Sequence, residues 1–210
     1  MTAHVGQRTT GVDADLAFIN ERVEASNRIG EAFFTEHAPA IAACAAAMAD
    51  RFFAGGTLIV FGSGPHATDA QHNAVEFVHP ALPGCRALPA IALSNDIATV
   101  TGMLQTEGAH EVYAHQLRLL GRPGDIALAF AHAPLHRSIA RGLEAGAAAG
   151  MLTVALTSGA ISDETALAEF RFHAASAEQE VAHELHLATY HMLWELVHIV
   201  LNHRGIGGPA

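Results

Sequence analysis

The chain of 210 residues contains no lysine, because all eleven of its basic residues are arginine. Without lysine, no Schiff base can form with a carbonyl substrate or with pyridoxal phosphate. A Walker A phosphate-binding loop also requires a lysine. The absence therefore excludes ordinary pyridoxal enzymes, lysine-dependent aldolases and Walker A nucleotide-binding proteins.

Positive charge, cysteine pairs and long apolar runs are also scarce. The formal net charge is −10, and no basic stripe typical of a nucleic-acid binder is present. Cys44 and Cys85 are far apart, so we expect two reduced thiols. No apolar run reaches the roughly 18 residues that span a bilayer, and the N-terminus lacks the pattern of a secretory signal. We therefore expect a cytoplasmic protein without nucleic-acid or membrane partners.

Apolar segments that alternate with helical segments dominate the chain. The segments predicted as strands are 57–62, 88–93, 125–130, 151–157 and 170–174. The segments predicted as helices are 15–51, 68–79, one from Asp96, 110–120, 135–149, 162–169 and 177–202, with Pro39 marking a helix start. This alternation predicts an α/β fold in which helices cover both faces of a five-stranded parallel sheet.

The predicted organisation is a single domain over 15–203, with an N-terminal helical arm. Residues 1–14 and 204–210 are expected to be flexible ends, because they are polar or rich in glycine. In a parallel α/β sheet, ligands bind beyond the carboxyl ends of the strands. The loops at 62–68, 94–96 and 131–137 are therefore the candidate ligand-binding loops.

Four segments in order resemble the sugar isomerase (SIS) domain family, most closely its sedoheptulose-7-phosphate (phosphoheptose) isomerases. They read VFGSGPHATDAQHNAVEF, LPAIALSND, GRPGDIALAF and AHELHLATYHMLWELVH. The resemblance covers about residues 15 to 203. It implies an SIS-type three-layer sandwich, an aldose–ketose isomerase activity on a sugar or sugar phosphate, and a homotetramer with sites near subunit contacts.

Histidine and glutamate at helical spacing form the expected catalytic site. His72 and Glu76 share a helix face, and His183 and His191 lie near one face of the last helix. The resemblance implies that the two faces meet, with Glu76 as base and His191 as acid. It also implies one zinc ion bound by His72, Glu76, His183 and His191. At His183 the family has glutamine, and imidazole is the better zinc ligand.

The same residues suit this chemistry independently of the resemblance. Sugar isomerisation needs a base for a carbon-bound proton and an acid for an oxygen, and a Lewis acid can polarise the carbonyl. Three imidazoles and a carboxylate suit zinc. A His–Glu pair at this spacing is, however, more often a surface pair worth a few tenths of a kcal/mol.

The expected phosphate cradle departs from the family pattern in both of its loops. Where the family has G-N-G-G-S, this chain has Gly62-Ser63-Gly64-Pro65-His66, and the family's S-T-S-G-x-S loop reads AHAPLH, residues 131–136. The loops could bind an anion through protonated histidines, accept a sugar without phosphate, or hold a second metal. The candidate substrate-binding residues are Ser63, Gly64, His66, Ser94, Asp96, His132, His136 and Thr157, while Asp69 is expected to cap a helix.

Two other functions remain open at this point. The chain could be a non-catalytic SIS module that binds a sugar derivative, or a histidine-rich metalloenzyme of another class. Turnover that disappears in Glu76→Gln would distinguish an isomerase from a binding module. More than one metal ion per subunit would favour the second alternative.

Overall fold

The computed structural model describes residues 11–159, 167–176 and 178–205. Contacts divide the chain into two units, Met1–Glu36 and His37–Ala210, and each is described by itself. Most of the helix expected at 162–169 and most of the two expected flexible ends lie outside the described residues. The extent of the single domain, 15–203, stays a prediction.

The first helix, α1 (Val12–Phe53), continues through Pro39. The prediction that Pro39 begins a helix was therefore wrong. Proline removes one hydrogen bond and clashes with the preceding turn. The alanine-rich sequence that follows has a strong helix-forming tendency, and this tendency offsets the local cost. Gly55, with φ of 88°, follows the end of the helix.

Five parallel strands form the sheet, which confirms the predicted architecture. They are β1 (Leu58–Gly62), β2 (Ala90–Ala92), β3 (Ile126–His132), β4 (Leu152–Ser158) and β5 (Phe170–Ala174). Their order is β2-β1-β3-β4-β5, and Leu58 pairs with Ile126, which in turn pairs with Leu152. Every residue of β1 and β4 is buried, as expected for strands covered on both faces.

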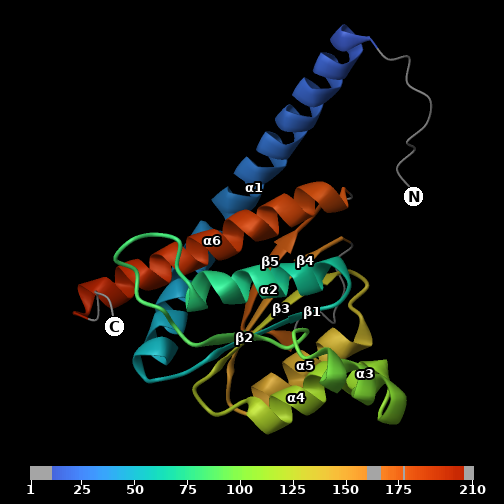
Figure 1. Cartoon of the computed structure of the whole chain (residues 1–210). Coiled ribbons are helices and arrows are strands. Elements are labelled where there is room, and N and C mark those ends of the chain that lie inside the picture. The colour runs from blue at the N-terminus through green and yellow to red at the C-terminus, as the bar shows by residue number, and fades with distance from the viewer. Residues whose placement is uncertain (1–10, 160–166, 177, 206–210) are drawn as a thin grey trace. The chain divides into compact units, whose positions relative to one another are not determined.

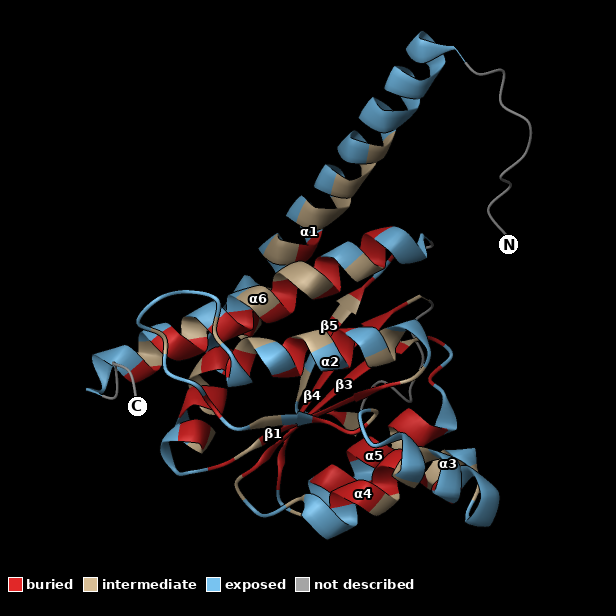
Figure 2. Cartoon of the chain, in the orientation of Figure 1, coloured by how far each residue is buried: buried red, intermediate tan, exposed pale blue. Residues whose placement is uncertain are grey.

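Helices lie on both faces of the sheet (Figure 1). α2 (Pro65–Val78) and α6 (Gln179–His203) lie together on one face. α4 (Val112–Leu120) and α5 (Arg137–Ala148) lie together on the other. The short α3 (Ile97–Thr106) and the 3-10 turn η1 (Ala109–Glu111) precede α4. Figure 2 shows buried residues on the sides of these helices that meet the sheet.

Small residues let α5 approach the sheet closely. A Cβ atom built on Gly142 would lie 2.6 Å from Cε2 of Phe61, a ring of β1 that is fully buried. Phe61 also packs against the ring of Tyr113 from α4, with centroids 5.3 Å apart. This core fixes the carboxyl end of β1, where the first candidate loop begins.

The strand order changes direction between β1 and β3. β2 lies on one side of β1, whereas β3, β4 and β5 follow on the other. Such a switch point leaves a crevice beyond the carboxyl ends of the two central strands. Gly62 of β1 is paired with Phe130 of β3, so the loops that follow them open side by side.

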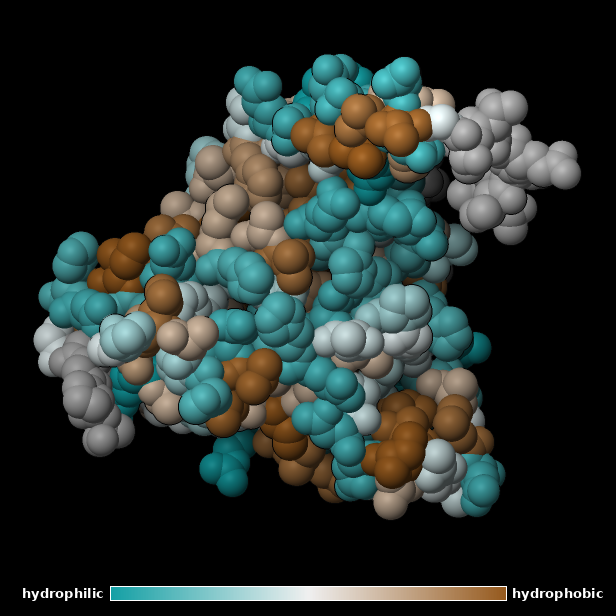
Figure 3. Space-filling model, turned by 45° about the horizontal axis from the view of Figure 1, so that its top comes forward, coloured by the Kyte–Doolittle hydropathy of each residue, from teal (hydrophilic) through white to brown (hydrophobic). Residues whose placement is uncertain are grey.

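One described helix, α1, is long and apolar enough by length and composition to cross a membrane. The sequence predicted no such helix, because it contains no uninterrupted run of apolar residues that is long enough. The many alanines of α1 raise the mean hydropathy of the helix without forming such a run. About a third of the apolar window is buried, and helices in protein cores pass the same test. Figure 3 shows apolar patches separated by hydrophilic surface on the face that it views.

Candidate functional site

Helices α2 and α6 run side by side in the same direction. Asp69 meets His183, His72 meets Tyr190, and the indole N–H of Trp194 donates to the carbonyl of Glu76 over 2.8 Å. Residue numbers increase in the same direction along the two helices in these contacts, so successive turns of α2 face successive turns of α6. Polar side chains between the two helices therefore gather in two separate clusters.

The first cluster consists of His72, Glu76 and His191, and we refer to it as the His72 cluster. Nε2 of His72 lies 3.1 Å from Oε1 of Glu76, and the rings of His72 and His191 meet edge to face with centroids 5.4 Å apart. One ligand atom from each residue lies within 4.8 Å of the others. All three side chains are partly exposed, so a ligand can reach them.

Tyr190 orients the His72 cluster from the protein interior. Its side chain is fully buried, and its hydroxyl lies 2.7 Å from Nδ1 of His72. Burial, followed by the charges of Asp69 and Glu76, raises the pKa of Tyr190 and keeps the phenol protonated. The phenol can then donate to Nδ1, so that Nε2 of a neutral His72 carries the hydrogen that Glu76 accepts.

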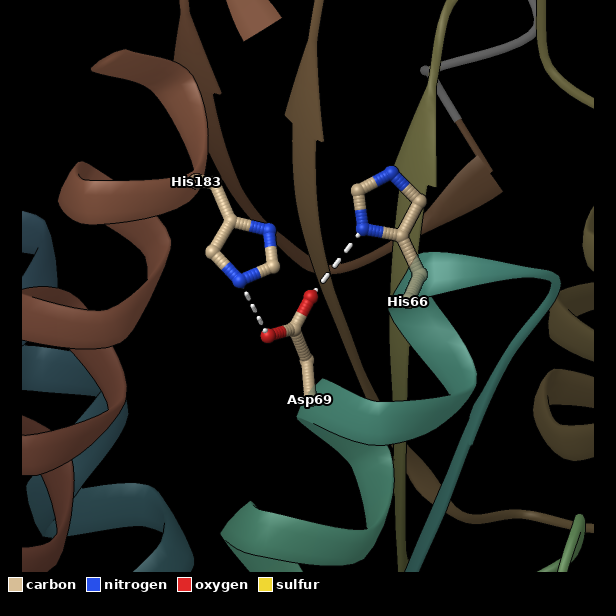
Figure 4. Close-up of side chains that lie close together, drawn as sticks. All are labelled: His66, Asp69 and His183. Carbon is tan, nitrogen blue, oxygen red and sulfur yellow. Dashed lines mark hydrogen bonds and ion pairs between the residues drawn. The ribbon is translucent and has the colours of Figure 1, made fainter. Parts of the chain in front are cut away.

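The second cluster consists of His66, Asp69 and His183, and we refer to it as the Asp69 cluster. Figure 4 shows the two rings approaching the Asp69 carboxylate from opposite sides. Nδ1 of His66 lies 3.1 Å from Oδ2, and Nε2 of His183 lies 3.0 Å from Oδ1. Asp69 is 4% exposed, and its carboxylate bridges the two helices rather than capping α2, contrary to expectation.

The expected four-ligand set is thus divided between the two clusters. His72, Glu76 and His191 are brought together, but His183 lies in the Asp69 cluster. The reason is helix geometry: eight residues separate His183 from His191, which is about 12 Å of rise along α6. In the same direction on α2, Asp69 precedes Glu76 by two turns, so each histidine meets a different acid.

A cavity of about 670 Å³ opens at the switch point. Its lining comes from the loops after β1 and β3, from the end of β4 and from the first turns of α6. The residues are Ser63, Pro65, His66, Phe130, Ala131, His132, His136, Ile139, Ser158, Gln179, Glu180, His183 and Glu184. Ser63, His66, His132 and His136 were predicted to bind substrate, and the structure places all four here.

Each imidazole in the cavity has one ring nitrogen bound to a protein group. Nδ1 of His132 lies 2.9 Å from Oγ of Ser158, and Nδ1 of His136 lies 2.8 Å from Oγ of Ser138. Nδ1 of His136 also accepts the backbone N–H of Ser138, so this histidine caps α5. These contacts fix the two rings, and no hydrogen bond to the other nitrogen of either ring is found among the described residues.

Four predicted substrate-binding residues are not among those that line the cavity. Asp96 is the N-cap of α3, where it accepts N–H groups of Ala98 and Thr99, and bonds from Thr99 lower its pKa. The buried hydroxyl of Thr157 lies 3.0 Å from Nδ1 of His173. Ser94 and Gly64 are also absent from the lining, although Ser63 and Pro65 on either side of Gly64 belong to it.

Several residues that shape the site were not predicted. Tyr190, Ser138 and Ser158 each contact an imidazole nitrogen. Tyr190 and Ser138 lie one or two residues from a histidine, whereas Ser158 stands at the end of the fourth strand, next to the predicted Thr157. His186 is fully buried and donates Nε2–H to the carbonyl of Thr157 over 3.0 Å. Burial lowers the pKa of His186 to about 4, so this ring is neutral near pH 7.

Sequence comparisons find relatives that match most of the chain. A family model described as SIS domain matches residues 23–158. A phosphoheptose isomerase from Thermodesulfovibrio yellowstonii is 32% identical over 183 residues, which cover 87% of this chain and 91% of the relative. A phosphoheptose isomerase from Chlorobaculum tepidum is 35% identical over 182 residues, covering 84% and 86%.

Solved structures show the same fold. A phosphoheptose isomerase from Francisella tularensis superposes with a TM-score of 0.82 at 27% identity, covering 88% of this chain and 98% of that one. A phosphoheptose isomerase from Neisseria gonorrhoeae gives a TM-score of 0.77 at 21% identity, covering 89% and 98%. At 21% identity, the similarity to the Neisseria gonorrhoeae structure shows a common fold and nothing more.

Proposed function

The chain belongs to the SIS domain family, and we propose that it is an aldose–ketose isomerase of the phosphoheptose isomerase type that acts on a sugar phosphate. The His72 cluster is the observation that carries this proposal. It places a carboxylate and two imidazoles at a position that ligands can reach. The reaction requires such groups, because one proton moves between two neighbouring carbons and another moves between their oxygens. The named relatives supply the reaction class.

In the proposed mechanism, Glu76 and His191 divide the proton transfers. The Glu76 carboxylate removes the proton from C2 of the aldose and delivers a proton to C1 of the resulting enediol. His191 transfers the proton between the two oxygens: O1 gains a proton as O2 loses its own and becomes the ketone oxygen, and the transfer runs the other way in the reverse reaction. The net change moves hydrogen from C2 and O2 to C1 and O1, and both residues return to their starting states.

His72 positions Glu76 for this task. Its ring lies between the Tyr190 hydroxyl and the Glu76 carboxylate, with contacts of 2.7 and 3.1 Å. A base whose oxygen already accepts one fixed hydrogen bond presents its other oxygen in a defined direction. Trp194 adds a bond to the Glu76 backbone and so fixes the helix turn that carries the base.

The donor set of the His72 cluster also fits the zinc ion that the family resemblance implies. Two imidazoles and a carboxylate are ligands found in catalytic zinc sites, and Tyr190 behind His72 is the kind of outer contact that orients a ligating imidazole. His72, Glu76 and His191 would hold the ion, with His183 as the expected fourth ligand only if it leaves Asp69. When bound, zinc would supply Lewis acidity at the substrate carbonyl.

The cavity fits the remainder of a sugar phosphate. Its volume of about 670 Å³ lies within the usual range for small-molecule sites. No arginine is found among the described residues that line it, so an anion would depend on imidazole N–H donors. We place the phosphate among His66, His132 and His136, and the reacting carbons at Glu76.

Assembly and location follow from the same reasoning. Apolar side chains on the α2–α6 face are exposed, namely Val75, Val78, Met192 and Ile199. They support a homo-oligomer, which we propose to be a tetramer, with the His72 cluster beside the subunit contact. Both cysteines are free, in agreement with a cytoplasmic location.

A single substitution tests the proposed activity. Glu76→Gln should reduce turnover of sedoheptulose 7-phosphate by about 10²- to 10⁴-fold, because it removes the base but retains the size of the side chain. Binding measured by calorimetry should stay within a few-fold of the wild type. Glu195→Gln, an exposed carboxylate on α6, is the matched control.

Three results would contradict the proposal. Wild-type protein that binds the sugar phosphate but neither isomerises it nor exchanges its C1 or C2 hydrogen with deuterated solvent would be a binding module. Products other than the aldose and ketose pair, identified by NMR, would indicate another enzyme class. Full turnover in Glu76→Gln would remove Glu76 from the mechanism.

A further inference from the structure

Two departures from the family motifs meet at one buried carboxylate. His66 stands where the family's first cradle loop has serine, and His183 stands where the last helix has glutamine. The two residues are 117 positions apart and lie on different helices, yet both rings contact Asp69 (Figure 4). Because both non-family histidines contact the same carboxylate, we treat His66, Asp69 and His183 as one site.

The geometry suits a metal ion. The contacts of 3.1 and 3.0 Å, one to each carboxylate oxygen of Asp69, are close to the separation of about 3.0 Å expected between neighbouring ligands at right angles, each about 2.1 Å from an ion. One ligand atom from each of the three residues lies within 4.8 Å of the others. The three residues therefore meet the distance requirement for sharing one ion.

We propose that His66, Asp69 and His183 bind a divalent first-row transition metal ion, distinct from any ion held by the His72 cluster. Two imidazoles and one carboxylate form the facial ligand set that binds Fe²⁺, and the same donors bind Zn²⁺, Co²⁺ and Ni²⁺. A carboxylate that is 4% exposed also gains from a compensating positive charge, which a divalent ion supplies.

The other cavity histidines do not take part in this site. His132 and His136 line the same cavity, but neither belongs to a group of three potential ligands among the described residues. Their Nδ1 atoms are bound to Ser158 and Ser138 instead. The chain therefore provides a matched control inside the same cavity.

The open coordination positions of the ion face the cavity. His66 and His183 both belong to its lining, whereas Asp69 lies behind them. Three protein ligands leave room for water or for oxygen atoms of a small molecule. The ligand class that this site would add is therefore an oxygen-donor molecule, such as a vicinal diol or a phosphate, bound directly to the ion.

The test measures metal binding and not turnover, so it does not depend on the proposed isomerase activity. Untagged protein is prepared without chelating resin, stripped of metal and titrated with Co²⁺ and Zn²⁺, followed by visible absorption and by metal analysis after dialysis. The His191→Ala background weakens the first cluster. His66→Ser and His183→Gln restore the family residues, and His132→Gln is the control.

The expected result is that one ion per subunit remains bound in the His191→Ala protein, and that adding His132→Gln to this background does not release it. Its affinity should fall at least tenfold when His66→Ser or His183→Gln is added. No ion in the His191→Ala protein would overturn the proposal and leave Asp69 as a hydrogen-bonded link between two imidazoles. Equal binding with and without His66→Ser and His183→Gln would overturn it as well. The two variants lie on different helices, so misfolding of one leaves the other decisive.

Discussion

Tyr190 connects the interior of the sheet to the proposed catalytic residues. Its ring packs edge to face against Phe130 of β3, with centroids 5.7 Å apart, and its hydroxyl reaches His72. Since burial raises the pKa of Tyr190, the phenol stays a hydrogen-bond donor throughout the neutral range. The buried Tyr190 thus contacts Nδ1 of His72 while Nε2 of the same ring faces Glu76.

Tyr190→Phe should separate this positioning role from simple packing. We expect kcat to fall about tenfold with little change in KM, because the His72 tautomer and the Glu76 orientation lose their support. The free energy of unfolding should fall by about 1 kcal/mol, as for one lost hydrogen bond. Steady-state kinetics over pH and urea unfolding measure the two effects.

A structural role alone would give a different pattern. The variant would lose stability while kcat and its pH profile remained as in the wild type. The exposed residue Met192 lies two positions from Tyr190, and Met192→Leu serves as the control for changes in this part of α6.

The sequence could not show which side chains of the site contact one another across different helices. His72 and Glu76 were predictable because spacing within one helix determines that they meet. The partner of His183 depends on how α6 is placed along α2, which no local pattern encodes. Asp96 and Thr157 stand near the expected strand ends, but the oxygens of Asp96 cap α3 and the hydroxyl of Thr157 contacts the partly buried His173.

At the scale of elements, the contact of α5 with the sheet depends on the absence of a side chain at Gly142. We expect Gly142→Ala to lower the free energy of unfolding by about 1–2 kcal/mol, because overpacking against Phe61 exceeds the gain in helix tendency. Gly102 in α3 has open space around it, so Gly102→Ala should raise stability by up to about 1 kcal/mol. Chemical unfolding of both variants measures the difference. If both substitutions stabilised the protein, the close packing of Gly142 against Phe61 would be contradicted.

Glu111 joins η1, α4 and α5 through two arginines. It lies 2.6 Å from Arg118 and 2.9 Å from Arg141, and hydrogen bonds from Arg118 first and Arg141 second lower its pKa. A carboxylate with a lowered folded pKa stabilises the protein above its unfolded value, and this contribution is lost as the pH falls through the folded pKa.

Glu111→Gln should therefore lower the free energy of unfolding only at pH values above the acid range. At pH 7 we expect the variant to lose about 1 kcal/mol of stability, the usual size for partly exposed ion pairs. Below the folded pKa of Glu111 the two proteins should converge. Thermal unfolding across pH measures this convergence, and a constant difference at every pH would argue against an ionic contribution.

Secondary structure was predictable where one effect dominates. The strands are apolar runs because helices cover both faces of the sheet, and all five appear within a few residues of their predicted bounds. Pro39 was misjudged because proline signals a helix start only when the surrounding sequence allows an interruption. In α1 the neighbouring alanines favour continuation.

At the scale of the whole molecule, the α2–α6 face should be a subunit contact. Light scattering after size exclusion should give a tetramer for the wild type. Val78→Arg or Ile199→Arg should reduce the mass, because a buried unpaired charge is costly at an interface. Leu119→Arg, on the exposed side of α4, should leave the assembly unchanged.

A monomeric wild type would contradict this assignment, and so would a tetramer unaffected by the α2 and α6 variants but broken by Leu119→Arg. The location of the cavity was partly predictable. The loops at 62–68, 94–96 and 131–137 were chosen because ligands bind at the carboxyl ends of parallel strands, and residues of the first and third line the cavity, whereas none of 94–96 does. The strand order, which places the crevice between β1 and β3, came from the structure.

The parallel course of α2 and α6 places the two clusters between the same two helices, two turns apart. An ion bound at Asp69, as proposed above, would therefore be expected to affect the spacing of the helices at Glu76 as well. Linkage is reciprocal: whatever change in affinity an ion at Asp69 causes for substrate at Glu76, substrate must cause for the ion. The helix pair would then couple binding of the ion to binding of the substrate.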